Sequence, residues 1–178
     1  DMELQKVEIC SLISGTTCVI VIQIEEHLIC SNLGDSRSIL VYDQDNSDSN
    51  LSKSSIRPLS YDCKPQLPKE KQRIEKYGGI VRQLTDSFGK TVGPFRVWNK
   101  QMTMPGIAMS RSIGDIYYKS LGVIPDPQIV DYKLNEMVKY MVICSDGIWE
   151  FLSNEDVMKI GNKYYIRNEP TRFCIDLF

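Results

Sequence analysis

The stretch TTCVIVIQIEEHLICSNLGDSRSILVY, residues 16–42, contains three apolar runs separated by short polar segments. The runs are CVIVIQI, LICSNL and SILVY, and the separators are residues 25–27 and 34–37. Runs rich in Val and Ile that are bounded by polar or glycine-bearing turns are typical of β-strands. Because strands joined by short turns pair in opposite directions, the stretch predicts an antiparallel meander.

Outside this stretch, local patterns predict further elements. PKEKQRIEKYGG at 68–79 predicts a helix that begins at Pro68 and ends near Gly78 or Gly79. YMVIC at 140–144 is uninterrupted and apolar, which predicts a strand buried on both faces. Ser153 and Asp156 fit a capping box that opens a helix running through Ile160. The polar segment 43–55, DQDNSDSNLSKSS, predicts a mobile loop.

The composition is that of a globular protein of one domain or a large part of one. The chain has 178 residues, with 21 basic and 23 acidic side chains and a net charge of −2. This balance argues against binding to nucleic acid or to an anionic membrane. No apolar run approaches the roughly 20 residues that cross a bilayer, and the first residues do not resemble a signal peptide. We therefore expect a soluble, cytoplasmic or nuclear protein.

Cysteine and histidine chemistry is a poor candidate for the function. None of the six cysteines forms a Cys-x-x-Cys pair, and His27 is the only histidine. This argues against a zinc site and against catalysis by a Ser-His-Asp or Cys-His arrangement. Cysteines within apolar runs are typical of reduced core thiols. Any chemistry is therefore expected to use carboxylates, with a metal ion.

Three acids stand out as candidate ligands. Asp146 follows the 140–144 run in the sequence Ser-Asp-Gly, where a carboxylate at the end of a buried strand would be partly desolvated. Asp35 lies in a similar glycine-bearing turn after a strand, and Glu150 lies four residues after Asp146. Such hard oxygen donors suit magnesium or manganese. The alternative is that both aspartates are ordinary turn residues and that Glu150 is a surface acid.

Four stretches, taken in order, resemble the type 2C metal-dependent serine/threonine protein phosphatases, in a variant similar to plant and protist members. The first is SGTT with NLGDSR, and the second is LSYD with KP, RI and GGIV. The third is RVW with PGIAMSRSIGD and GVIPDP, and the fourth is CSDGIWE with LSN. The resemblance implies an α+β fold in which two antiparallel sheets form a sandwich flanked by helices. It implies that a metal-activated water hydrolyses phosphoserine and phosphothreonine on proteins, without a phosphoenzyme. Two or three Mg²⁺ or Mn²⁺ ions are implied for the complete domain.

The resemblance also assigns roles to individual residues. Asp146 matches the aspartate that binds the core pair of metal ions. Asp35 and Glu150 match positions that form a third metal site with it, although Glu150 stands where aspartate is commoner. For Arg111 and Asp115 we expect a structural role, tying a strand to the turn that follows.

Several family segments are missing from the 178 residues. They are the Asp-Gly-His-Gly-Gly stretch, an earlier phosphate-binding arginine and a closing Asp-Asn segment. We therefore expect residues 1–178 to be a single partial catalytic domain, inactive as it stands, with phosphorylated proteins as the substrates of the enzyme. The alternative is a non-catalytic pseudophosphatase that acts as a protein-binding module, against which the retained acids argue.

Overall fold

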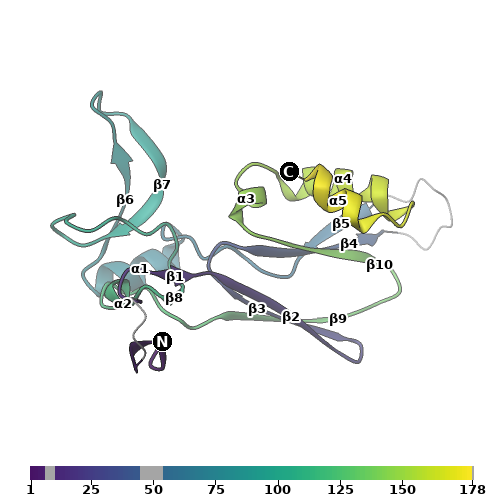
Figure 1. Ribbon diagram of the computed structural model, residues 1–178, viewed down its shortest axis with the longest axis horizontal. Coiled ribbons are helices and arrows are strands. Elements are labelled where there is room, and N and C mark those ends of the chain that lie inside the picture. The colour runs from purple at the N-terminus through teal and green to yellow at the C-terminus, as the bar shows by residue number, and fades with distance from the viewer. Residues whose placement is uncertain (7–10, 45–53, 178) are drawn as a thin grey trace. The chain divides into compact units, whose positions relative to one another are not determined.

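The computed structural model describes residues 1–6, 11–44 and 54–177, which form two compact units (Figure 1). Each unit has its own hydrophobic core. The single partial domain expected for residues 1–178 thus contains two units, and its status as one domain stays a prediction. Unit 1 comprises Asp1–Cys18, Leu33–Asp35 and Asp62–Pro127, and unit 2 comprises Val19–Asn32, Ser36–Tyr61 and Gln128–Phe178.

Unit 2 contains two three-stranded sheets. One has the strand order β2-β3-β9 and the other the order β10-β4-β5. Strand β3 pairs antiparallel with β9, and β4 pairs antiparallel with both β5 and β10. The strands are β2 (Cys18–Ile24), β3 (His27–Leu33), β4 (Arg37–Asp43), β5 (Ser54–Pro58), β9 (Gln128–Lys133) and β10 (Val138–Cys144).

The three-stranded meander predicted for residues 16–42 is wrong in its third strand. β2 and β3 are neighbours, but β4 is the central strand of the other sheet. The chain changes sheets at Gly34, which has φ +108°, a conformation that favours glycine. β4 can be central because its apolar side chains face both ways: Leu40 packs in one cluster, and Ile39 and Val41 pack in another.

These two clusters define three layers in unit 2. Leu40 packs with Leu28 and Cys30 of β3, so this cluster fills the space between the sheets. Ile39 and Val41 pack with Trp149 and with Val157 of a helix, so the second cluster lies between the β10-β4-β5 sheet and the helices. In Figure 1 the helices lie on the side of that sheet away from β2, β3 and β9. The predicted α+β sandwich flanked by helices is confirmed.

The helices of unit 2 follow β10 in the chain. They are α3 (Asp146–Trp149), α4 (Asn154–Tyr165) and α5 (Pro170–Asp176). The predicted capping box at α4 is confirmed: Asp156 N donates to Ser153 Oγ at 3.1 Å, and Ser153 N donates to Asp156 Oδ2 at 3.3 Å. The helix that it opens runs beyond Ile160 to Tyr165.

The burial predicted for residues 140–144 is wrong. β10 is an edge strand of its sheet, and Met141 and Ile143 are 38% and 41% exposed. Its apolar sequence indicated burial, but one face packs on the helices and the other is half open.

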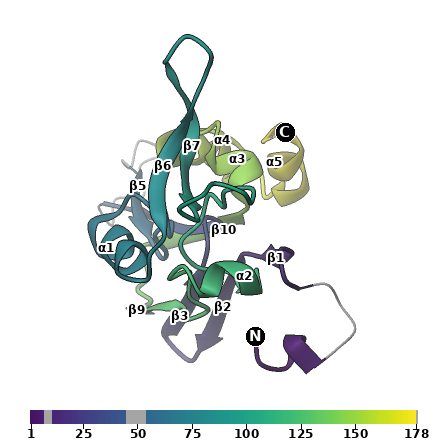
Figure 2. The same cartoon turned by 90° about the vertical axis from the view of Figure 1, so that its left-hand side faces the viewer.

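Unit 1 is built around α1 and a long hairpin. Its core comprises Ile74, Val97, Tyr118 and Val123. The helix predicted at 68–79 is confirmed, beginning at Pro68 and ending at Lys76, before Gly78 at φ +82°. Figure 2 shows the β6–β7 hairpin extending away from α1 and α2. The elements are η1 (Leu4–Lys6), β1 (Gly15–Thr16), α1 (Pro68–Lys76), β6 (Ile80–Thr85), β7 (Thr91–Trp98), β8 (Ile113–Gly114) and α2 (Ile116–Lys119).

The predicted mobile loop at 43–55 falls mostly outside the described residues. Its ends are strand residues, because Asp43 pairs with Ser54 and Tyr42 pairs with Ser55. None of the helices in the described part of the chain has the length and apolar character needed to cross a membrane.

Candidate functional site

Asp146 begins α3 and Glu150 is its C-cap residue, one helical turn later. β10 ends at Cys144, Ser145 is extended as the N-cap, and Asp146 is the first helical residue. Glu150 N donates to the backbone oxygen of Asp146 at 2.8 Å. Both side chains are exposed, and within the described residues neither has an ion pair or a side-chain hydrogen bond. The structure therefore brings two accessible, unengaged carboxylates together.

The expected desolvation of Asp146 is wrong. Because β10 is an edge strand and α3 turns at the surface, the carboxylate is exposed to solvent. An exposed carboxylate keeps its hydration and remains available to a cation. Gly147 does not need its conformational freedom here, since an added Cβ would lie 3.4 Å from Ser145 Oγ, an ordinary contact.

Trp149 fixes the short helix to the sheet. Its Nε1 is 2.8 Å from the backbone oxygen of Cys144 and 3.1 Å from that of Arg37, so one N–H is shared between two strand ends. The Arg37 guanidinium lies 5.1 Å from the Trp149 ring centroid and donates to Asn154 Oδ1 at 2.7 Å. Trp149 and Ile148 are 7% and 5% exposed. A helix of four residues is thus held in place by its buried side, with Asp146 and Glu150 on the surface.

Asp35 has a different environment, in unit 1. Its side chain is 6% exposed, and Lys64 Nζ donates to Oδ2 at 2.7 Å. The backbone around it is fixed because Cys63 N donates to the oxygen of Gly34 at 2.8 Å. A side chain at Gly34 would also collide with Thr17, whose Cγ2 would lie 2.3 Å from the added Cβ. Asp35 is therefore a buried carboxylate that already has a cationic partner.

The donor chemistry fits a hard cation only in part. Asp146 and Glu150 supply accessible carboxylate oxygens, which Mg²⁺ and Mn²⁺ prefer. Asp35 belongs to the other unit and is engaged by Lys64. Across residues 1–6, 11–44 and 54–177, no three His, Cys, Asp or Glu side chains form a group that could hold a metal ion. The assignment of all three acids as metal ligands stays a prediction.

Arg111 belongs to a buried ion cluster in unit 1 that the sequence did not indicate. Its Nη2 donates to Glu70 Oε1 at 2.7 Å, and Arg73 Nη2 donates to Glu70 Oε2 at 2.6 Å. Ser110 Oγ donates to the same Oε2 at 2.7 Å. Burial alone would raise the pKa of Glu70, but the hydrogen bonds from Arg111, Arg73 and Ser110 outweigh it and lower the pKa to about 2.

This cluster explains what Arg111 does. Its partners are Glu70 and the backbone oxygen of Asp126, so it ties α1 to the segment after β8. Asp115 does not contact Arg111 through any of these bonds: it is the N-cap of α2, and its Oδ2 lies against Gly15. Arg111 and Asp115 both have structural roles, but each acts through its own partners and not through the other.

Comparison with known proteins gives a consistent result over the whole chain. The family model described as Protein phosphatase 2C matches residues 1–176. Probable protein phosphatase 2C 61 of Arabidopsis thaliana is 33% identical over 162 residues, which are 91% of this chain and 47% of that protein. Probable protein phosphatase 2C 12 of Oryza sativa subsp. japonica is 40% identical over 147 residues, 83% of this chain and 36% of that protein.

The structural comparison supports the same fold. The serine-threonine phosphatase 2C from Toxoplasma gondii superposes with a TM-score of 0.76, over 99% of this chain and 54% of that one, at 19% identity. The chain thus spans about half, or less, of the length of the proteins that it matches. From the family model and the two plant relatives, the chain belongs to the protein phosphatase 2C family.

Proposed function

We propose that this chain forms part of the catalytic domain of a Mg²⁺- or Mn²⁺-dependent serine/threonine protein phosphatase. The observation that carries the proposal is the exposed, unengaged carboxylate of Asp146 on a helix that Trp149 fixes to the sheet. The match to the protein phosphatase 2C family over residues 1–176 supports the interpretation of that carboxylate as part of a phosphatase site. The substrates that we propose are phosphorylated proteins, and the location is the cytoplasm or nucleus.

The residues of this chain have separate tasks in the proposed site. Asp146 is the first candidate metal ligand and Glu150 the second, because both are accessible and close in sequence on one helix. Asp35 is the third candidate, and its oxygen would have to exchange Lys64 for a metal ion. A divalent metal ion, when bound, supplies a Lewis acid that offsets phosphoryl charge and activates water. Trp149 holds the backbone that carries the two carboxylates in place against the sheet, which limits where they can meet a ligand.

We further propose that residues 1–178 alone do not turn over phosphoprotein. Two free carboxylates on one helix are fewer ligands than a hard cation requires to be held in a fixed geometry. The activity therefore belongs to a protein in which this chain is combined with further ligands.

The experiment compares two samples in hydrolysis of a phosphothreonine peptide with and without Mn²⁺. One is purified 1–178, and the other is the gene product captured through an epitope tag placed at its own locus. The tagged allele is also made with Asp146→Asn and, as a matched control on an exposed acid of α4, with Glu155→Gln. The proposal predicts Mn²⁺-dependent turnover by the captured protein, loss with Asp146→Asn, and wild-type turnover with Glu155→Gln.

Two results would count against the proposal. A captured protein that binds phosphoproteins without hydrolysing them at any Mn²⁺ concentration would favour the non-catalytic binding module. Turnover by purified 1–178 that disappears with Asp146→Asn would contradict the inactivity of the isolated chain while supporting the role of Asp146.

A further inference from the structure

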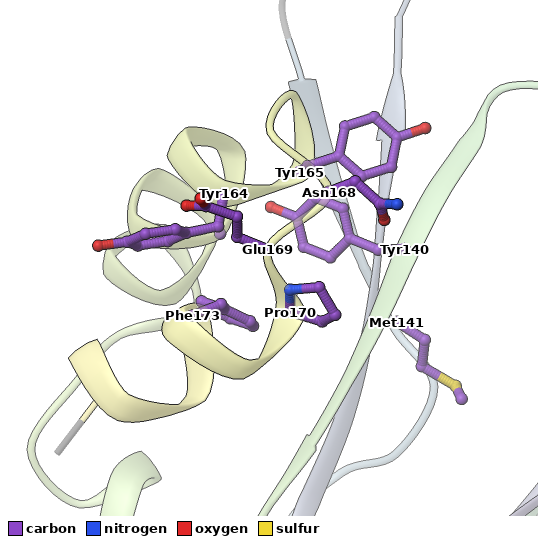
Figure 3. A pocket seen from close by; sticks show the side chains of 9 residues that line it. Tyr140, Met141, Tyr164, Tyr165, Asn168, Glu169, Pro170 and Phe173 are labelled. Carbon is purple, nitrogen blue, oxygen red and sulfur yellow. The ribbon is translucent and has the colours of Figure 1, made fainter.

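Unit 2 contains an aromatic pocket that none of the candidate metal ligands lines. It has a volume of about 270 Å³ and lies between β10 and the helices α4 and α5 (Figure 3). Its lining includes four aromatic rings, one carboxylate and one amide, which come from Tyr140, Tyr164, Tyr165, Phe173, Glu169 and Asn168. Tyr140 and Phe173 also pack against the core cluster of Ile39, Val41 and Trp149, so these two rings lie between the core and the pocket.

The rings of the pocket are held by contacts of their own. Tyr140 lies with its ring centroid 5.4 Å from that of Tyr165 and 6.3 Å from that of Phe173. The Tyr140 hydroxyl donates a hydrogen bond to Asn162 Oδ1 at 3.0 Å, and the Tyr164 hydroxyl donates one to Asp176 Oδ2. Both hydroxyls are thus engaged by residues that do not line the pocket.

Glu169 lacks a partner on one of its two oxygens. Oε1 lies 3.4 Å from Arg172 Nη1, whereas Oε2 is buried and has no hydrogen-bond partner among the described residues. The negative charge on a buried carboxylate oxygen is poorly solvated, so a positive charge in the pocket would stabilise it through charge attraction. The electrostatics of the pocket therefore favour a cation.

The aromatic rings favour the same charge. A cation within about 6 Å of a ring centroid is attracted by the ring quadrupole. Tyr165 already accepts one, because Lys139 Nζ lies 5.5 Å from its centroid while paired with Asp43 Oδ1 at 2.8 Å. The rings and the acid thus point to the same class of ligand.

We infer that this pocket binds a quaternary ammonium group. A primary ammonium brings three N–H donors, each of which requires an acceptor when it is desolvated. In the described lining Tyr140 and Tyr164 use their hydroxyls elsewhere. The side-chain acceptors that remain are one oxygen of Glu169, the Asn168 amide and the Tyr165 hydroxyl, and the last two belong to exposed residues. A quaternary ammonium has no N–H donor and gains from both ring faces and negative charge.

The test titrates the whole 178-residue chain with choline by calorimetry, against 3,3-dimethylbutanol, its neutral isostere. The chain should bind choline at least about tenfold more tightly than the isostere, because only choline carries the charge that the site favours. Glu169→Gln should weaken choline binding by about tenfold and leave the isostere unchanged. Tyr165→Leu should weaken it by about threefold, and Glu155→Gln, on exposed α4 surface, should change nothing.

The variants are chosen so that folding does not decide the result. Tyr165 is 46% exposed, the Glu169 side chain is 32% exposed and its partner Arg172 is 69% exposed, so circular dichroism should show melting close to wild type for both variants. Equal binding of choline and its neutral isostere would overturn the inference, as would equal choline affinity in wild type and Glu169→Gln. A trimethyllysine peptide run beside choline identifies the source of the group: tighter peptide binding indicates a modified protein, and tighter choline binding a free metabolite.

Discussion

The substitution Glu70→Gln tests the ion cluster of unit 1. Glu70 is 4% exposed and accepts hydrogen bonds from Arg73, Ser110 and Arg111. Glutamine keeps one carbonyl oxygen but places an amide donor against a guanidinium and removes the only carboxylate of the cluster. Because the substitution leaves two arginine side chains without their charge partner, it removes most of the electrostatic stabilisation.

The magnitude follows from the pKa of Glu70. A shift from the ordinary value of 4.5 to about 2 corresponds to about 3 kcal/mol of folding free energy at neutral pH. Counted without its backbone, the Glu70 side chain is 5% exposed, so solvent screening reduces this free energy only slightly. We expect Glu70→Gln to lower the free energy of unfolding by about 3 kcal/mol, within the range for breaking a buried ion pair.

The assay is urea unfolding of both proteins at a series of pH values. Glu75→Gln is the control on the same helix: its exposed pair with Lys71, at 3.7 Å, contributes about 0–1 kcal/mol. Since the folded-state pKa of Glu70 lies below its unfolded value, its contribution is complete above about pH 4.5 and is lost as pH falls towards 2. Equal losses for the two variants at pH 7, or a Glu70→Gln penalty that does not shrink below pH 4.5, would refute the reasoning.

Three further substitutions test packing and pairing. Gly106→Ala places a Cβ 2.5 Å from Trp98 Cε2, so unfolding free energy should fall by about 1–3 kcal/mol in urea titration. Trp149→Phe removes an N–H shared by two carbonyls and replaces a buried indole with a smaller ring, and should destabilise by at least about 1–2 kcal/mol in the same assay. Lys64→Met leaves the buried Asp35 carboxylate without its cation and should destabilise by about 3 kcal/mol at pH 7.

The glycine and lysine substitutions each have a matched control. Gly147→Ala should be nearly neutral, because its Cβ would meet only Ser145 Oγ at 3.4 Å. Lys71→Met removes an exposed cation and should change stability by less than about 1 kcal/mol. If Gly106→Ala were as stable as Gly147→Ala, the close contact with Trp98 would be contradicted. If Lys64→Met were as stable as Lys71→Met, the pairing with Asp35 would be contradicted. Wild-type stability of Trp149→Phe would contradict the anchoring of α3 by Trp149.

Local signals predicted the local elements well. Pro68 and the glycines after it fixed both ends of α1, and Ser153 with Asp156 formed the predicted capping box, because caps and turns depend on neighbouring residues. Gly34 was expected to form a turn, but nothing local indicated that the turn passes the chain to a second sheet. Whether β10 is a central or an edge strand likewise depends on which strands lie beside it.

In the candidate site, too, local spacing was readable from the sequence, whereas contacts between distant residues were not. Sequence placed Glu150 four residues after Asp146, a spacing that brings two side chains to one side of a helical turn, and the structure forms that turn. It did not predict the Lys64 partner of Asp35, because the two are 29 residues apart in the chain. Glu70 was missed altogether: an acid in an amphipathic helix normally faces solvent, and its arginine partner Arg111 is 41 residues away. The spacing of Glu70 and Arg73 was the one local signal available.

The most direct test of the central claim is whether Asp146 binds a divalent cation. Substoichiometric Mn²⁺ added to ¹⁵N-labelled 1–178 broadens the amide signals nearest to bound metal, even when binding is weak. The account predicts that the signals of residues 146–150 broaden first, that Asp146→Asn abolishes this, and that Glu155→Gln leaves it unchanged. Broadening centred elsewhere in the chain, or identical broadening in wild type and Asp146→Asn, would contradict it.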